Sequence, residues 1–142
     1  MKGWVAVALC CLTPAYGQGR PSADVPFAGC YEVISLTWSP PDETIKLIPK
    51  RFRLLNEAVQ PGRSIFKVRA VPSSLSARIE IWRPKGNQFW ISWGTGFGGF
   101  HGTLTQSNTG EFVGKLKEWC DARCGWKRRV GKMRVRKIDC TE

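Results

Sequence analysis

The fold is decided by two stretches near opposite ends of the chain, CYEVIS at residues 30–35 and KMRVR at residues 132–136. In both stretches apolar and polar side chains alternate, which is typical of a β-strand with one buried face. The first stretch places Tyr31, Val33 and Ser35 on one face of its strand. The second places its apolar residues toward the core and its basic residues toward solvent. Each end of the domain is therefore predicted to be a half-buried strand.

The chain between these stretches consists of short β-rich runs separated by Pro, Gly, Asn and Ser, and no window has helical periodicity. We predict the strands Cys30–Trp38, Arg51–Asn56, Ser64–Val71, Ala77–Arg83, Gln88–Gly94, Gly99–Thr105, Glu111–Trp119 and Trp126–Asp139. Turn residues stand at Gln60–Gly62, Arg83–Asn87 and Ser107–Gly110, whereas the three prolines of Ser39–Lys50 exclude a central strand there. Alternation alone leaves open which face of Gln88–Gly94 is buried.

The N-terminal residues have the pattern of a secretory signal peptide. A positively charged start precedes the apolar run Trp4–Leu12, which is too short to span a membrane, and Ala15 and Gly17 suit a cleavage site. Lipidation at Cys10 or Cys11 is an alternative, although a bulky residue precedes each of them. We predict a signal peptide over 1–17, a flexible segment over 18–28 and a β-barrel domain over 29–142. The predicted location is secreted or periplasmic.

Four cysteines follow the predicted signal peptide, and an even number in an exported chain indicates two disulfides, for which three pairings exist. Cys120 and Cys124 flank three residues and can close a tight turn, whereas Cys30 begins the first predicted strand and Cys140 follows the last. We therefore predict the disulfides Cys30–Cys140 and Cys120–Cys124. A zinc site is disfavoured because only one pair of cysteines has a suitable spacing, and we predict no metal site.

About eight antiparallel strands joined by short turns leave two exposed sheet edges, which closure into a barrel removes. In a closed meander with an even number of strands, the first and last strands lie side by side and antiparallel. The start of the first strand then lies beside the end of the last, where Cys30 and Cys140 stand. We therefore predict an all-β fold, a single up-and-down antiparallel β-barrel, with an open β-sandwich as the alternative.

Gly29-Cys30-Tyr31, at the start of the first strand, resembles the Gly-x-Trp motif of lipocalins, with Tyr31 in the place of the tryptophan. Within that resemblance, Arg134 or Arg136 is similar to the arginine that packs over the aromatic ring. The resemblance implies a small calycin-type barrel with an open mouth. The chain also resembles small exported bacterial proteins of unknown function, through WSPP at residues 38–41, RFRL at 51–54, WISW at 90–93 and GF at 96–97.

Meander topology gathers the connectors Ser39–Lys50, Pro72–Ser76, Gly94–Gly98 and Cys120–Gly125 at one end of the barrel. This end collects aromatic and basic residues, and barrels of this size can hold one small ligand. We predict that the mouth binds a small apolar or amphipathic ligand through Trp38, Trp93, Phe97, Trp126, Arg123 and Lys127. The alternative is that the aromatic side chains fill the barrel as its core.

The chain has 22 lysines and arginines against 11 acidic residues, a net charge of +11. Such an excess serves solubility or attracts anionic partners. Alternation turns basic residues of the last two predicted strands outward as a stripe, which consists of Arg128, Lys132, Arg134, Arg136, Lys115 and Lys117. The alternative function is therefore a protein- or polyanion-binding module with a filled barrel. An inhibitor of an exported enzyme and a binder of the envelope surface are two forms of it.

His101 is the single histidine, and the sequence marks neither a serine motif nor a metal-ligand partner for it. Asp42 and Glu43 lie in the proline-rich connector, and the glycines of residues 94–99 do not open a helix, as a phosphate-binding loop requires. We therefore predict that the protein is not an enzyme and needs no cofactor. We expect a monomer without a transmembrane segment.

Overall fold

The computed structural model describes residues 25–41, 48–71, 79–95, 97–121 and 128–141. These residues form strands and no helix. The strands are β1 (Gly29–Ser39), β2 (Arg51–Ala58), β3 (Phe66–Ala70), β4 (Ile79–Lys85), β5 (Gln88–Gly94), β6 (Gly98–Gln106), β7 (Phe112–Cys120) and β8 (Val130–Ile138). The predicted signal peptide, with Cys10 and Cys11, lies outside the described residues.

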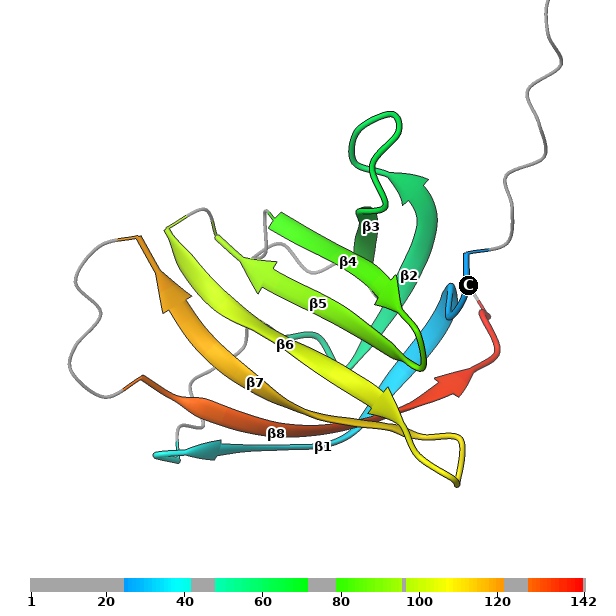
Figure 1. Cartoon of the computed structure of the whole chain (residues 1–142). Helices are drawn as coiled ribbons and strands as arrows, with labels where there is room; N and C mark the ends of the chain where they lie inside the picture. Colours follow the sequence, from blue (N-terminus) through cyan, green and yellow to red (C-terminus); the bar gives the residue numbers. More distant parts are fainter. Residues whose placement is uncertain (1–24, 42–47, 72–78, 96, 122–127, 142) are drawn as a thin grey trace, which may run out of the picture.

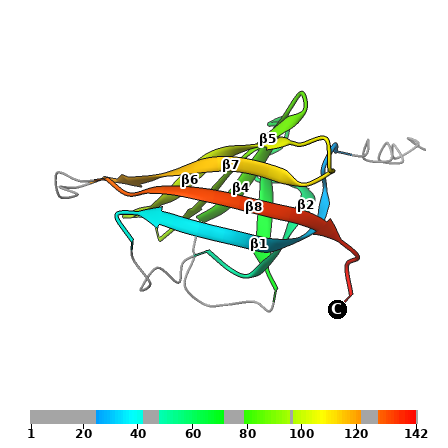
Figure 2. The same ribbon diagram turned by 90° about the horizontal axis from the view of Figure 1, so that it is seen from below.

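The eight strands form a closed barrel in chain order, in which each strand pairs antiparallel with the next (Figure 1). β8 also pairs antiparallel with β1, from Cys30 opposite Ile138 to Ser39 opposite Val130. Figure 2 shows these two strands side by side. The all-β up-and-down barrel is therefore confirmed, and the open sandwich is excluded.

The strand boundaries lie close to those predicted. β3 begins at Phe66 rather than at Ser64, and the Val59 N–H donates to the carbonyl oxygen of Ile65 (2.8 Å) just before it. β8 begins at Val130, and its predicted start at Trp126 lies outside the described residues. Local alternation and turn residues therefore located the strands well.

A disulfide between Cys30 and Cys140 seals the junction of β1 and β8, with a Cα–Cα separation of 5.3 Å between residues that are 110 positions apart. The C-terminal end of the described chain lies beside the start of β1 (Figure 1). The predicted pairing is confirmed. The second predicted disulfide, Cys120–Cys124, stays a prediction because Cys124 lies outside the described residues.

A β-bulge interrupts the alternation of β1. The register between β1 and β8 shifts between Val33 and Ser35. Residues directly opposite each other point to the same side of the sheet, so Ser35 points outward with Arg134, and Leu36 points inward with the buried Met133. The expectation that Ser35 shares the buried face of Tyr31 was therefore wrong, because the extra residue of a bulge exchanges the two faces of the strand that follows.

Aromatic and aliphatic side chains fill the described interior of the barrel. The large side chains that are fully buried are Tyr31, Phe52, Leu54, Trp82, Phe89, Ile91, Trp93, Leu104, Phe112, Leu116, Met133 and Val135. The inward face of β5 is thus that of Phe89, Ile91 and Trp93. Tyr31 stacks on Phe52 with ring centroids 5.6 Å apart and also contacts Phe89. The described core is packed by side chains, as is usual in narrow barrels.

Residues 25–28, ahead of β1, close one end of this core. The Phe27 ring makes an edge contact with Phe112, with centroids 5.2 Å apart, and its carbonyl oxygen accepts a hydrogen bond from the Tyr31 hydroxyl (2.7 Å). Phe27 has a positive φ of 71°, which is strained for a bulky residue. Its ring contacts and hydrogen bond hold it there, so this part of the predicted flexible segment packs against the barrel.

Two glycines let β6 and β7 approach closely. A Cβ at Gly102 would lie 2.1 Å from the carbonyl oxygen of Lys115, and a Cβ at Gly114 would lie 2.0 Å from that of Thr103. Both positions belong to the inward-facing rows of their strands, beside Leu104 and Leu116. Glycines at such positions allow the sharp coiling that closes a small barrel.

Candidate anion-binding face

The predicted mouth residues are divided between the core, the surface and the part of the chain that is not described. Trp93 is fully buried and contacts Phe52, whereas Trp38 is half-buried, lies 4.4 Å from Phe100 between centroids and covers Gly131. Phe97 is 81% exposed. Arg123, Trp126 and Lys127 lie outside the described residues. Half of the predicted cluster therefore lies outside the described residues, and ligand binding by it stays a prediction.

An ion pair that the sequence analysis missed lies at the same end of the barrel. Glu118 stands opposite the buried Phe100, so it points to the inner side of the sheet. Its carboxylate accepts hydrogen bonds from the Arg129 main-chain N–H (3.1 Å) and Nε (3.2 Å), and Arg129 Nη2 lies 3.1 Å from Oε1. The pair crosses from β7 to the residue before β8 and occupies part of the end where we predicted an open mouth.

Two further polar groups face the interior. Glu80 stands opposite Trp93 and thus points inward, where burial raises the pKa of its carboxyl group and a backbone hydrogen bond at Ala70 partly opposes the rise. The Trp93 Nε1–H is buried and has no hydrogen-bond partner among the described residues, and the same is true of the Trp119 Nε1–H. Buried donors are normally paired, so these two indoles are unusual.

The arginine that the lipocalin resemblance places over the first-strand aromatic ring is absent from that position. Tyr31 points into the barrel, whereas Arg134 and Arg136 are exposed on its outer surface. Arg134 pairs with Glu111 (2.7 Å), and Arg136 pairs with Glu32 (2.8 Å). That expectation was wrong because the alternation of β8 turns its basic residues away from the core.

The predicted basic stripe lies on the outer surface of β7 and β8. Lys115 and Lys132 stand directly opposite each other across these strands, and Lys117 stands opposite Val130. All three lysines are exposed, as is Arg128, which precedes β8. Like charges directly opposite each other repel, so the pair across β7 and β8 is destabilising until an anion lies between them.

The charges of this stripe differ in whether they are neutralised. Arg134 pairs with Glu111, whereas Arg136 and Arg51 on β2 both pair with Glu32, the latter at 3.3 Å. The contacts of Glu32 with Arg136 and Arg51 hold the pKa of its carboxyl group below the usual range, and desolvation of the carboxylate acts against them. No carboxylate among the described residues pairs with Lys115, Lys117 or Lys132, which are therefore the more available cations.

A shallow groove of about 400 Å³ adjoins these lysines on the outer face of β5–β7. Trp90, His101, Gly102, Thr103, Lys115 and Lys117 line it. The centroids of the Trp90 and His101 rings lie 6.0 Å apart. The Arg83 guanidinium lies 5.2 Å from the centroid of the Trp90 ring. Sequence reasoning missed Trp90 and treated His101 as isolated, because their contact depends on the register of β5 against β6.

We call the outward side chains Trp90, His101, Lys115, Lys117 and Lys132 the basic face. Burial and the neighbouring Lys117 charge both lower the pKa of the His101 imidazole, so it is neutral near pH 7 and becomes a further cation only in acid. The strands fix the order of these groups, since Trp90 is opposite Thr103, Thr103 opposite Lys115, and Lys115 opposite Lys132. The arrangement offers one aromatic surface beside a row of cations.

The described residues contain neither a metal site nor a membrane-spanning helix. Within residues 25–41, 48–71, 79–95, 97–121 and 128–141, no group of three or more His, Cys, Asp or Glu side chains is placed to hold a metal ion. No helix in these ranges has the length and hydrophobicity of a membrane span. Comparison of the chain with protein-family models, with curated proteins and with solved structures gave no match.

Proposed function

We propose that the protein is a non-enzymatic binding module of the extracytoplasmic space, and that its basic face takes an extended anionic polymer. The observation that carries the proposal is a row of lysines, Lys115, Lys117 and Lys132, which have no acidic partner among the described residues and lie beside the half-buried outward ring of Trp90. Polymers with repeated anionic groups release bound counterions when lysines neutralise them, which favours association.

The geometry suits a linear ligand rather than a compact one. Neighbouring strands lie about 4.8 Å apart, so the lysines of β7 and β8 and the ring on β5 span roughly 15 Å across the sheet. A chain laid along this row meets Lys132, then Lys115, and then the face of Trp90. An aromatic ring offers stacking contact to a base or another flat group, and cations at its sides hold the charged backbone.

The filled interior supports the same proposal. Tyr31, Phe52, Trp82 and Phe89 are fully buried in contact with one another, which makes the barrel a rigid scaffold for the outer face. A rigid sheet keeps the cations in register without loss of backbone entropy on binding. Binding energy then depends on the outward side chains alone, which can be replaced without disturbing the core.

Heparin binding tests this proposal. The triple variant Lys115→Gln/Lys117→Gln/Lys132→Gln should elute from immobilised heparin at clearly lower salt and bind at least tenfold more weakly at constant ionic strength. A control that removes the same charge elsewhere, Lys50→Gln/Arg63→Gln/Lys85→Gln, should change the affinity much less. Equal losses in the two variants would mean that only net charge matters, and would contradict a defined face.

Small-ligand binding inside the predicted mouth is a second candidate function, and the unpartnered Nε1–H of Trp93 favours it. A ligand oxygen at this indole would satisfy the buried donor, and Glu80 faces the same interior. Native mass spectrometry of protein purified from its own host tests this function. A copurified small molecule that the triple lysine variant retains would support it, and an unliganded mass under mild conditions would count against it.

A further inference from the structure

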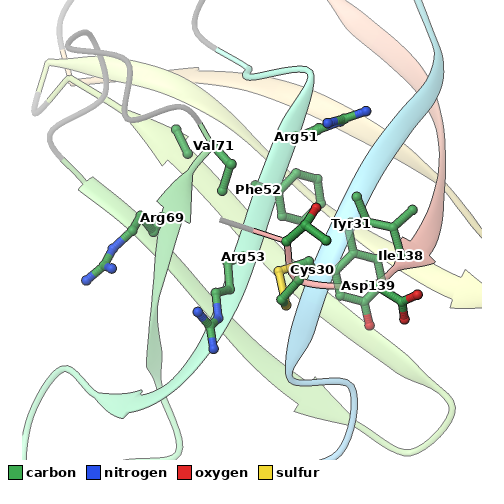
Figure 3. Close-up of a pocket in the computed structure, with 12 residues that line it drawn as sticks. Cys30, Tyr31, Arg51, Phe52, Arg53, Arg69, Val71, Ile138 and Asp139 are labelled. Carbon is green, nitrogen blue, oxygen red and sulfur yellow. A yellow bond between two sulfur atoms is a disulfide. The ribbon is translucent and has the colours of Figure 1, made fainter.

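A second pocket, of about 220 Å³, lies where the first three strands meet the C-terminal segment (Figure 3). Its lining comes from β1, β2, β3 and residues 138–141. The Cys30–Cys140 disulfide forms part of the wall and holds the C-terminal residues in place. This pocket is on different strands from the groove of the basic face and involves none of its side chains.

Three arginines border the pocket. Arg53 and Arg69 stand directly opposite each other on β2 and β3, in one row with Cys30. Figure 3 shows both side chains extending to the same side of the pocket, whereas Arg51 extends from the other side. Arg51 is already paired with Glu32.

The side chains of Arg53 and Arg69 form no ion pair or hydrogen bond with any part of the described chain. Two unpaired like charges opposite each other on neighbouring strands destabilise a sheet, unless an anion bridges them. Arginine is suited to that role, because its planar fork binds a carboxylate or phosphate with two parallel hydrogen bonds. The acidic side chain in the lining, Asp139, comes from the opposite wall.

The rest of the lining is largely apolar. Val71, Ile138 and the disulfide surround the cavity, together with parts of Tyr31 and Phe52. Cavities of roughly 150 Å³ accept benzene, so a volume of about 220 Å³ is sufficient for one ring or a short alkyl group. An apolar cavity with two neighbouring cations at one rim matches a molecule that has an apolar body and an anionic end.

We propose that this pocket binds a small amphipathic anion, with a carboxylate or phosphate between Arg53 and Arg69 and an aryl or short alkyl group against the disulfide. The ligand class is thus the one expected from the sequence for a barrel mouth, but its site is on the outside of the barrel. The site is independent of the proposed polyanion-binding function, because the two use different residues.

Titrations followed by amide NMR shifts test the site, with phenyl phosphate, benzoate, inorganic phosphate and benzyl alcohol as probes. Phenyl phosphate or benzoate should shift the amides of residues 52–54 and 69–71 at saturable concentrations. The variant Arg53→Gln/Arg69→Gln should bind at least tenfold more weakly, whereas the charge-matched control Arg63→Gln/Lys85→Gln should bind as the unmodified protein does. Which acid binds more tightly distinguishes a carboxylate ligand from a phosphate ligand.

Several results would overturn the assignment. One is equal binding by the two double variants, and another is equal affinity for inorganic phosphate, which lacks the apolar body, or for benzyl alcohol, which lacks the charge. The unliganded Arg53→Gln/Arg69→Gln variant provides a further check, because removal of an unrelieved repulsion should leave its melting temperature unchanged or higher. A lower melting temperature would mean that the arginines stabilise the fold and would contradict the argument.

Discussion

Removing the Cys30–Cys140 disulfide should destabilise the protein strongly. The bond joins residues that are 110 positions apart, and the chain-entropy model gives about 4.8 kcal/mol for a loop of that length. For a domain of this size, one kcal/mol shifts the melting temperature by about 4 °C, so Cys30→Ser/Cys140→Ser should melt roughly 20 °C lower.

Urea unfolding of residues 18–142, followed by tryptophan fluorescence, measures this loss. Amide shifts at Val33 and Val135, which are opposite each other on β1 and β8, report whether the seam remains paired in the variant. The predicted Cys120–Cys124 disulfide closes a much shorter loop, for which the same model gives about 2 kcal/mol, so its removal is the matched comparison.

The long-loop disulfide should contribute more to stability than the short-loop one while the seam stays paired. A variant with unchanged seam shifts and a loss of less than about 1 kcal/mol would refute the entropic account of this bond. A larger loss from the short loop than from the long one would refute it as well.

Three further predictions concern single interior positions. Burial raises the pKa of the Glu80 carboxyl group, so the stability that this group contributes is present below pH 4.5 and is lost as the pH rises through the raised pKa. Glu80→Gln should therefore increase the urea midpoint at pH 7 and lose that advantage in acid. Gly114→Ala should lower the free energy of unfolding by about 1–3 kcal/mol, because its Cβ would lie 2.0 Å from the Thr103 carbonyl oxygen; an unchanged urea midpoint would contradict the close approach of β6 and β7. Burial raises the pKa of Tyr31 well above 10.0, and it is the only tyrosine beyond residues 1–17, so absorbance at alkaline pH should show no phenolate until the chain unfolds.

Much of the architecture follows from short-range features of the sequence. Alternation and turn residues located the strands, since both depend on neighbours within a few positions. Closure of the barrel was also predictable, because an even meander brings Cys30 and Cys140 to one junction. The outward direction of Lys132, Arg134 and Arg136 followed from the same alternation.

The alternation rule failed where its periodicity is broken. The bulge after Val33 turns Ser35 outward, and no residue in that stretch signals an extra position. The rule was also silent where both faces are apolar, so the packing of Trp93 inside the barrel and of Trp90 outside it was decided only by the assembled core. Residues such as Phe97, assigned to the mouth by connectivity, depend on loop conformation that topology alone does not specify.

Sequence by itself thus determined the strands, their order and the seam, because these depend on local periodicity and on the parity of the strand count. Only the tertiary structure decided which charges are neutralised and which are free. Arg134 and Arg136 have acidic partners, whereas Lys115 and Lys132 face each other, and Arg53 faces Arg69. The physical reason is that a cross-strand neighbour is set by register, which the packing of the whole core selects and no single strand encodes.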